Sequence, residues 1–477
     1  MSEIKQDQDQ FIVKPTLIQY GHHVLIKLPS SGLKVAHVTE GGSINLGKFG
    51  TFDLSGIVGF PFGQTFEVLD ERKVRAVKST TYGNVDTLEP EDIPTADANA
   101  DAAASDVVMD ETSKENTPEP KTLGEKIDYL KRLDVKSSET NRDLLDIGAG
   151  SQALTMEEIE TLKKTSKGAN IGEAIIDKLI KSHANFNKKT IHSQEKYLKR
   201  KQQKFLRRFT VEYLGSSQLL QYYLEKEASK VLDMSEETLG LLLSLGNIQS
   251  GGRYLVIDET SGVLIAALLE RMRGSGEIVL LHENEHPNIS ALDHSNFPIE
   301  IRQKMIDSLN LLQFFEPESE RVEFQEYSTE ELKELKSNKR THYHRRKQNA
   351  IDTNKAIDNA IKGDFDALIV ATTLYTPTLM KRLIESVGGS RPIIIYSQFK
   401  EPLIETQLDF MNDLRILTPA LHESKARPYQ TIPGRLHPMM TMRGGGGYLL
   451  SALRVYPVEE GVTAVGRGLK KKQKFEK

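Results

Sequence analysis

The sequence predicts an α/β protein in which a C-terminal Rossmann-like domain, with a doubly wound and mostly parallel sheet, follows an N-terminal β-barrel-like domain and a helical connecting region. From residue 251 onward, short apolar runs such as RYLVID, EIVLLHEN, FDALIVAT and RPIIIYSQ alternate with helical segments. This alternation is typical of βαβ units. Near the N-terminus, closely spaced β-type runs are separated by Gly and Pro, which indicates a small barrel or sandwich.

A chain of 477 residues is too long for one ordinary core, so we expect several folding units. We divide it into a β-barrel-like domain (11–80), an acidic linker without fixed structure (81–140), a helical region that contains a basic helix (141–250), a Rossmann-like domain (251–462) and a basic tail (463–477). The absence of cysteine excludes disulfides and thiolate metal sites. Apolar runs fall short of the roughly 20 residues of a membrane span, so we expect no membrane partner.

The acidic linker hides the charge of the rest of the chain. Residues 85–120 contain eleven acidic side chains and one lysine, Lys114, among Ala, Pro, Ser and Thr. Such a composition buries too little apolar surface to fold alone. Removing its net charge of −10 from the formal −4 of the chain leaves +6, so the remainder is basic and suited to a nucleic acid.

The turn after the first strand of the Rossmann-like domain is where such folds place a cofactor. It reads LVIDETSGV, and only Gly262 provides the open backbone that a cofactor loop needs. Thr260 and Ser261 put side chains where glycine is wanted. We expect no cofactor to be bound here; Asp258 is either a vestigial contact or, as we favour, a cap carboxylate.

The next strand ends before Glu283, which stands where related folds bind a ribose diol and is a second vestigial candidate. The fourth strand ends in Ala371, Thr372 and Thr373. A catalytic site at this strand end would want a hydrogen-bond acceptor such as a carboxylate, and these residues supply none. We therefore predict no catalytic residue in this chain.

Two further patterns carry no chemistry. His282, His286 and His294 lack metal-ligand spacing, so we predict no metal site. The run of glycines at 444–447 has no following Lys-Ser/Thr and therefore is no phosphate loop. We expect it to form a tight hairpin or to pack closely through its backbone.

The strongest basic segment is KKTIHSQEKYLKRKQQKFLRR, residues 188–208, with nine Lys or Arg and one acid, Glu195. Drawn as one helix, it places Leu198, Phe205 and Phe209 on one face and its charges elsewhere. We expect the following side chains to bind RNA phosphates, the alternative being a solvated face: Lys196, Lys199, Arg200, Lys201, Lys204, Arg207 and Arg208.

A second basic segment, residues 336–347, has six bases and no acid around Tyr343. Basic side chains with an interleaved aromatic suit RNA, because Arg and Tyr also stack on bases; the alternative is a flexible loop. The candidate contacts are Lys339, Arg340, Arg345, Arg346 and Lys347. The tail GRGLKKKQKFEK is a third basic cluster, either an RNA contact, a nuclear import signal or a solvated end.

Several segments in this order, SINLGKFGTF, GIVGFPFGQTFEV, NRDLLD, EKYLKRKQQKFLRRF and GGGGYLLSALRVYPV, resemble the non-catalytic subunits of eukaryotic tRNA (adenine-N1)-methyltransferases. The resemblance covers nearly the whole chain apart from the acidic linker and the ends. It implies a methyltransferase fold with a degenerate cofactor site, and it carries the family's basic helix over onto Lys196 to Arg208.

The resemblance further implies an enzyme that forms N1-methyladenosine at position 58 of the tRNA TΨC loop, initiator methionine tRNA included. In that family the catalytic partner binds S-adenosylmethionine and carries the catalytic aspartate, and two such partners join two non-catalytic subunits in a nuclear heterotetramer. The alternatives are a self-sufficient S-adenosylmethionine-dependent RNA methyltransferase and a scaffold associated with translation initiation.

Overall fold

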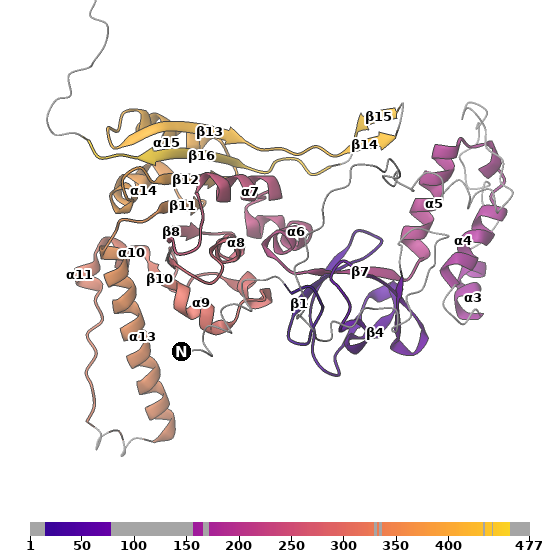
Figure 1. Ribbon diagram of the computed structural model, residues 1–477, viewed down its shortest axis with the longest axis horizontal. Helices are drawn as coiled ribbons and strands as arrows, with labels where there is room; N and C mark the ends of the chain where they lie inside the picture. The colour runs from indigo at the N-terminus through magenta and orange to yellow at the C-terminus, as the bar shows by residue number, and fades with distance from the viewer. Residues whose placement is uncertain are drawn as a thin grey trace, which may run out of the picture. The chain divides into compact units, whose positions relative to one another are not determined.

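The computed structural model describes residues 15–77, 156–165, 171–328, 332, 336–432, 435–440 and 442–457. The chain divides into two compact units, one from Val13 to Leu214 and one that begins at Gly215. Each unit has its own hydrophobic core. Figure 1 labels their elements.

The sheet of the first unit is antiparallel and has the order β2-β1-β7-β5-β6. Its strands are β1 (His23–Lys27), β2 (Leu33–His37), β5 (Thr65–Val68), β6 (Val74–Val77) and β7 (Arg208–Tyr213). A separate hairpin of β3 (Ser43–Asn45) and β4 (Thr51–Asp53) packs on it. Phe52 of the hairpin stacks on Phe209 of β7 with ring centroids 4.4 Å apart, so the two layers share one core. The N-terminal antiparallel β-domain is therefore confirmed.

Strand β7 corrects the expected boundary of the helical region 141–250. Its residues continue the basic segment but belong to the β-domain, where Phe209 and Val211 are buried between β1 and β5. The sequence RFTVEY is rich in β-branched and aromatic residues, with its apolar side chains Phe209 and Val211 two positions apart, which favours a strand. Phe209 is therefore a residue of the sheet core and not of the basic helix.

Three helices lie between β6 and β7 in the described sequence: α3 (Met156–Thr165), α4 (Ile171–Lys181) and α5 (Ile191–Phe205). They share a small apolar cluster to which α4 contributes Ile176 and Leu179 and α5 contributes Leu198 and Phe205. Phe186, in the short 3-10 turn Phe186–Lys188, joins this cluster. The cluster holds one face of α5 and leaves its charged faces outside.

The second unit contains a seven-stranded mixed sheet with the order β10-β9-β8-β11-β12-β16-β13. Its strands are β8 (Arg253–Asp258), β9 (Glu277–His282), β10 (Ile306–Asn310), β11 (Ala367–Ala371), β12 (Pro392–Ser397), β13 (Ile416–Glu423) and β16 (Tyr448–Arg454). The first five pair in parallel, and β16 is antiparallel to both neighbours. The predicted α/β methyltransferase-like fold is confirmed, with β8 at the point where the strand order reverses.

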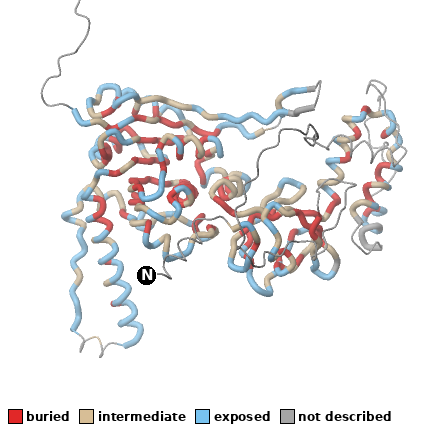
Figure 2. Tube along the Cα trace, viewed as in Figure 1, coloured by how far each residue is buried: buried red, intermediate tan, exposed pale blue. Residues whose placement is uncertain are grey.

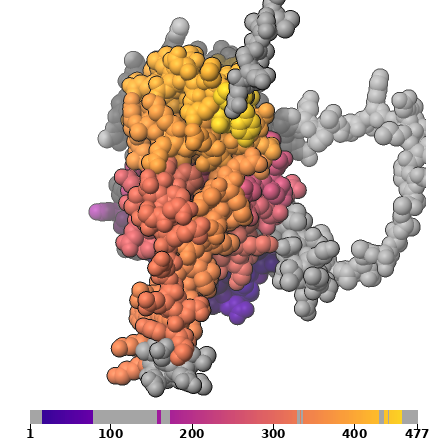
Figure 3. Space-filling model, turned by 90° about the vertical axis from the view of Figure 1, so that its left-hand side faces the viewer, coloured from indigo at the N-terminus to yellow at the C-terminus, as the bar shows by residue number. Residues whose placement is uncertain are grey.

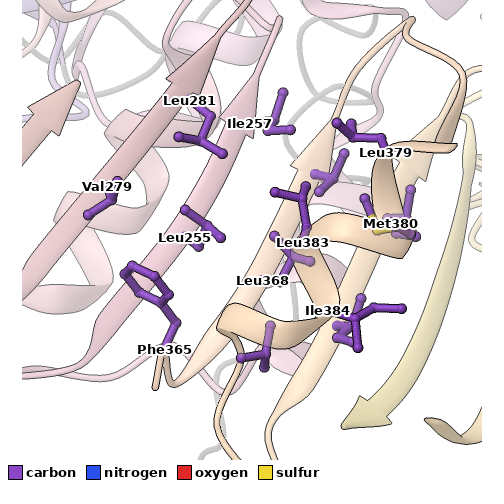
Figure 4. Packing of buried hydrophobic residues seen from close by; sticks show 14 of the residues in the cluster. Leu255, Ile257, Val279, Leu281, Phe365, Leu368, Leu379, Met380, Leu383 and Ile384 are labelled. Atoms are coloured by element: carbon purple, nitrogen blue, oxygen red, sulfur yellow. The ribbon is translucent and has the colours of Figure 1, made fainter. Parts of the chain in front are cut away.

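The described residues of this unit form the helices α6 (Ser216–Lys226), α7 (Glu236–Leu245), α8 (Val263–Met272), α9 (Ile299–Met305), α10 (Leu311–Phe315), α11 (Pro317–Glu320), α13 (Ser337–Ile361), α14 (Thr376–Leu383) and α15 (Glu401–Met411). Figure 4 shows Leu379 and Leu383 of α14 facing the sheet residues Leu255 and Leu368. The central strands are buried, as Figure 2 shows in red. A ribbon of β14 (Tyr429–Ile432) and β15 (Arg435–Pro438) extends from β13 and β16.

The backbone of the glycine run 444–447 packs closely against its surroundings at Gly446 and Gly447, as expected. Gly447 has φ +77°, and a Cβ added there would lie 2.2 Å from the Tyr396 ring. Gly446, with φ +127°, lies against Ser235, whose side chain caps α7 by accepting from the N–H of Thr238. Glycine is needed here because the backbone itself packs on an aromatic ring in a left-handed conformation.

Candidate functional site

The turn after β8 is closed by its own hydrogen bonds. Asp258 is buried, and its Oδ1 accepts from the backbone N–H and the hydroxyl of Thr260 at 2.6 and 2.5 Å. Its Oδ2 accepts from the N–H of Ile265 at 3.3 Å, while the Thr260 hydroxyl oxygen accepts from the N–H of Leu264 at 3.0 Å. Burial raises the pKa of the Asp258 carboxyl, and the hydrogen bonds from Thr260 and Ile265 oppose that rise.

These contacts make Asp258 a cap of α8, as the sequence favoured. In nucleotide-binding folds the free N–H groups of this helix start hold the ligand. Here the N–H groups of Leu264 and Ile265 are satisfied by the chain's own oxygens. The turn therefore offers a ligand few of the donors that the fold usually presents.

Glu259 brings a carboxylate to the end of β11, where the strand's own residues supply none. Its Oε1 accepts from the hydroxyl of Thr372 at 2.5 Å, and its Oε2 accepts from the N–H and hydroxyl of Thr373 at 2.8 and 2.7 Å. The residues of the strand end supply no carboxylate, but the fold brings one to it from the neighbouring turn. Three donors within the chain occupy most of the acceptor capacity of this carboxylate, so its main contacts are structural.

The other side of the turn is covered by the segment that follows β9. The carbonyl of Ser261 accepts from the N–H of Ala291 at 2.9 Å, and the Ser261 hydroxyl donates to the carbonyl of Lys230 at 3.0 Å. Gly262 has φ +90°, and a Cβ there would lie 2.8 Å from Cα of Ile289. The one glycine of the turn is therefore used for packing against the chain itself.

Glu283, the other vestigial candidate that carries a carboxylate, follows β9 and is exposed. The neighbouring His282 is half-buried, and its ring Nδ1 lies 2.6 Å from the carbonyl of Asn284. Burial lowers the pKa of His282, which disfavours the charged form of the ring. The vestigial set is split: Asp258 and Gly262 lie inside the fold, and Glu283 lies on the surface.

Helix α5 presents a cationic surface over four exposed side chains, Lys196, Lys199, Arg200 and Lys204. Lys201 and Arg207 are partly buried. Within the described part of the chain, no carboxylate forms an ion pair with any of the four exposed bases. The helix keeps its charges available to an anionic partner.

Arg208 does not belong to this surface, which corrects the sequence expectation. It is the first residue of β7 and only 2% exposed. Its guanidinium lies 3.3 Å from Glu173 of α4 and 3.8 Å from Glu67 of β5. Because a buried charge needs partners, Arg208 serves as a structural ion-pair residue and not as a phosphate contact.

The second basic segment forms the start of α13, a 25-residue helix. Only its later part packs on the sheet, where Lys355 and Asn359 donate to Asp307 of β10 at 3.0 and 2.6 Å. The earlier part projects from the unit as an arm, seen in Figures 1 and 3. Of the predicted RNA contacts, Lys339, Arg340, Arg345 and Arg346 are exposed there, whereas Lys347 pairs with Glu326 at 2.6 Å.

Tyr343 is buried within this arm and does not face outward. Its ring stacks on Tyr327 with centroids 5.0 Å apart and contacts Phe324 at 5.2 Å. Its hydroxyl accepts from the N–H of Tyr327 at 3.1 Å. Tyr343 is therefore not placed to stack on an RNA base. Its ring instead holds the segment 321–328 against α13.

Other predicted features lie outside the described residues: the acidic stretch 85–120, the remainder of the linker and the basic tail 463–477. Among the residues that are described, no group of three His, Asp or Glu is arranged to hold a metal ion. No helix in these ranges combines the length and the apolarity needed to cross a bilayer.

Sequence reasoning missed Glu259 and the surroundings of Tyr197. Glu259 lies in the turn after β8, but its role depends on the neighbouring strand β11. Tyr197 is flanked by Lys189 and by Lys201, and His183 contacts its edge. The (i, i+4) spacing of Tyr197 and Lys201 is a signal that a helical drawing could have found.

Comparisons with known proteins point in one direction. The Gcd10p family matches residues 17–339. The tRNA (adenine(58)-N(1))-methyltransferase non-catalytic subunit TRM6 of Debaryomyces hansenii is 50% identical over 459 residues, which cover 96% of this chain and 91% of that protein. The protein of the same name from Eremothecium gossypii is 44% identical over 452 residues, which cover 92% of this chain and 93% of that protein.

Solved structures show more distant likenesses. A SAM-dependent O-methyltransferase from Thermotoga maritima aligns with a TM-score of 0.45 and 10% identity, over 93% of this chain and 96% of that one. The tRNA (m1A58) methyltransferase TrmI from Aquifex aeolicus aligns with a TM-score of 0.34 and 15% identity, over 52% of this chain and 79% of that one.

Proposed function

Because the chain belongs to the Gcd10p family, we propose that it is the non-catalytic subunit of a tRNA (adenine(58)-N(1))-methyltransferase, which binds tRNA and requires a catalytic partner for methylation. The relative from Debaryomyces hansenii that bears this name is 50% identical and aligns with 96% of this chain. The subunit has a methyltransferase-like fold and performs no methyl transfer itself.

One observation carries this proposal: the cofactor turn is bonded to itself. Asp258 and Thr260 cap α8, and Glu259 caps the end of β11. A methyltransferase needs an open turn for its cofactor and a free acceptor for its base. In this chain the groups that stand at both positions are committed to the fold.

S-adenosylmethionine is bound by the catalytic partner and not by this chain. The partner supplies the methyl donor and the catalytic carboxylate, and the assembly contains two subunits of each kind. It methylates N1 of adenosine 58 in the TΨC loop, initiator methionine tRNA included, and it resides in the nucleus. The lack of cysteine suits such a reducing compartment.

The contribution of this chain is RNA binding by two cationic surfaces. The first is α5, with Lys196, Lys199, Arg200 and Lys204 exposed, and the second is the α13 arm, with Lys339, Arg340, Arg345 and Arg346 exposed. Phosphate contacts of this kind release counterions, so binding should fall steeply with salt.

The decisive experiment measures tRNA methylation by this chain alone, by a co-expressed catalytic partner alone and by both together. Calorimetry with S-adenosylmethionine is performed on each sample. We expect turnover only in the mixture and cofactor binding only where the partner is present. Turnover by this chain alone, or full turnover by the partner alone, would refute the proposal.

A further inference from the structure

Three nitrogen-bearing side chains converge around Tyr197 beneath the exposed surface of α5. The ammonium of Lys189, just before the helix, lies 4.8 Å from the centre of the Tyr197 ring, and that of Lys201 lies 4.9 Å from it. The His183 ring meets the ring of Tyr197 edge to face at 5.2 Å. Cation–π attraction holds both lysines against one aromatic ring.

Two hydrogen-bond donors face each other in this cluster. The N–H of Asn185 lies 3.3 Å from Nδ1 of His183, and a neutral imidazole accepts a hydrogen bond at only one of its two nitrogens. Nε2 lies 3.0 Å from Nζ of Lys189, which is itself a donor. An oxygen that accepts from both groups would resolve this arrangement.

The cluster is also short of negative charge. Among the ion pairs of the described residues, none involves His183, Lys189 or Lys201. Burial lowers the pKa of Lys189 and of Lys201, and Lys204 and Lys189 lower that of Lys201 further. The pKa of His183 is lowered by burial and by the charges of Lys189 and Lys201. A bound anion would relieve this mutual repulsion.

We infer that His183, Lys189 and Lys201 form a binding site for a single phosphate group of the RNA backbone, with Tyr197 holding the two lysines in place. The inference rests on the proposed function, because that function supplies the RNA. It adds two residues, His183 and Lys189, that lie outside the exposed basic surface. It also assigns to Tyr197 a positioning role.

A pH dependence follows from this site. The groups that face His183 are Lys189 from the turn before α5 and Lys201 and the Tyr197 phenol from α5 itself. A phosphate beside the ring raises the His183 pKa above its value in the free protein. Protonation of His183 therefore favours binding. The resulting increase in RNA affinity is fully present below the His183 pKa of the free protein, and it is lost as the pH rises through the His183 pKa of the complex.

The test uses the complete complex with its catalytic partner and fluorescently labelled tRNA. Affinity is measured by anisotropy against salt and pH for K189Q, K201Q and H183Q. The matched control is K188Q, which removes the same charge from the exposed neighbour Lys188. Inorganic phosphate is titrated separately as a competitor, which distinguishes a site for backbone phosphate in RNA from one for the free ion.

We expect K189Q to weaken tRNA binding several-fold more than K188Q and to lower the log–log salt slope by about one unit. H183Q should flatten the pH dependence, and inorganic phosphate should compete only weakly. Equal effects of K189Q and K188Q, an unchanged pH profile in H183Q, or competition by phosphate at concentrations comparable to tRNA would overturn the site. Methylation by the wild-type complex, measured first, reports on the proposed function separately.

Discussion

The carboxylate of Glu259 holds the end of the neighbouring strand through Thr373, whose backbone N–H and hydroxyl both donate to Oε2, at 2.8 and 2.7 Å. Glu259 follows β8, and Thr373 follows β11, its partner in the sheet. The contact joins the two strand ends between which a methyltransferase-like fold would place its reaction. Glu259 therefore has a structural role at this edge of the sheet.

Replacing Glu259 with Ala should lower the free energy of unfolding by about 1–3 kcal/mol, because the N–H and hydroxyl of Thr373 lose their acceptor. It should not create S-adenosylmethionine binding, since Asp258 and Thr260 still cap α8. Urea denaturation and calorimetry measure the two effects. Glu285→Ala, at an exposed acid, is the control and should leave stability unchanged. Cofactor binding gained by E259A would contradict this account of the turn.

Gly262→Ala should destabilise the second unit by about 1–3 kcal/mol. The position has φ +90°, and the added Cβ would lie 2.8 Å from the backbone of Ile289. Gly240→Ala is the matched variant, because this glycine lies within α7 with nothing within 4 Å of an added Cβ. It should stabilise by about 0.5–1 kcal/mol. Thermal unfolding of both variants measures the contrast, and equal shifts would show that the Ile289 contact has no effect.

Arg208→Gln should lower stability by about 3–5 kcal/mol, because it leaves Glu67 and Glu173 without their shared buried cation. Arg200→Gln, on the exposed face of α5, should leave stability nearly unchanged and lower the salt slope of tRNA binding by about one unit. Urea unfolding and salt-dependent anisotropy separate the two roles. A stable R208Q protein with a reduced salt slope would mean that Arg208 reaches RNA.

Tyr343→Ala should weaken tRNA binding by the complex several-fold without a change in salt slope, because the four exposed bases of the α13 arm remain but the arm loses order. Tyr343→Phe keeps the stacked ring and loses only the hydroxyl contact to Tyr327, so it should restore most of the affinity. Hydrogen exchange over residues 321–328 reports the loosening directly. An affinity loss equal in Y343A and Y343F would argue against ring stacking as the cause.

The sequence predicted much of the fold for a clear reason. Strand and helix periodicity are local properties, and the alternation after residue 251 indicated the parallel strands that the structure contains. The turn at 258–262 was recognised as poor in glycine from its letters alone. The position of β7 was missed, because a basic segment reads as one helix until its last residues are paired with β1 and β5.

The sequence alone determined the α/β class, the two basic segments and the scarcity of glycine in the turn after β8, because these depend on neighbouring residues. Only the tertiary structure decided that Arg208 is buried, that Glu259 reaches Thr373 and that His183 faces Lys189. Each of these outcomes depends on how separate elements pack. Burial and hydrogen-bond partners are set by that packing, which no local pattern specifies.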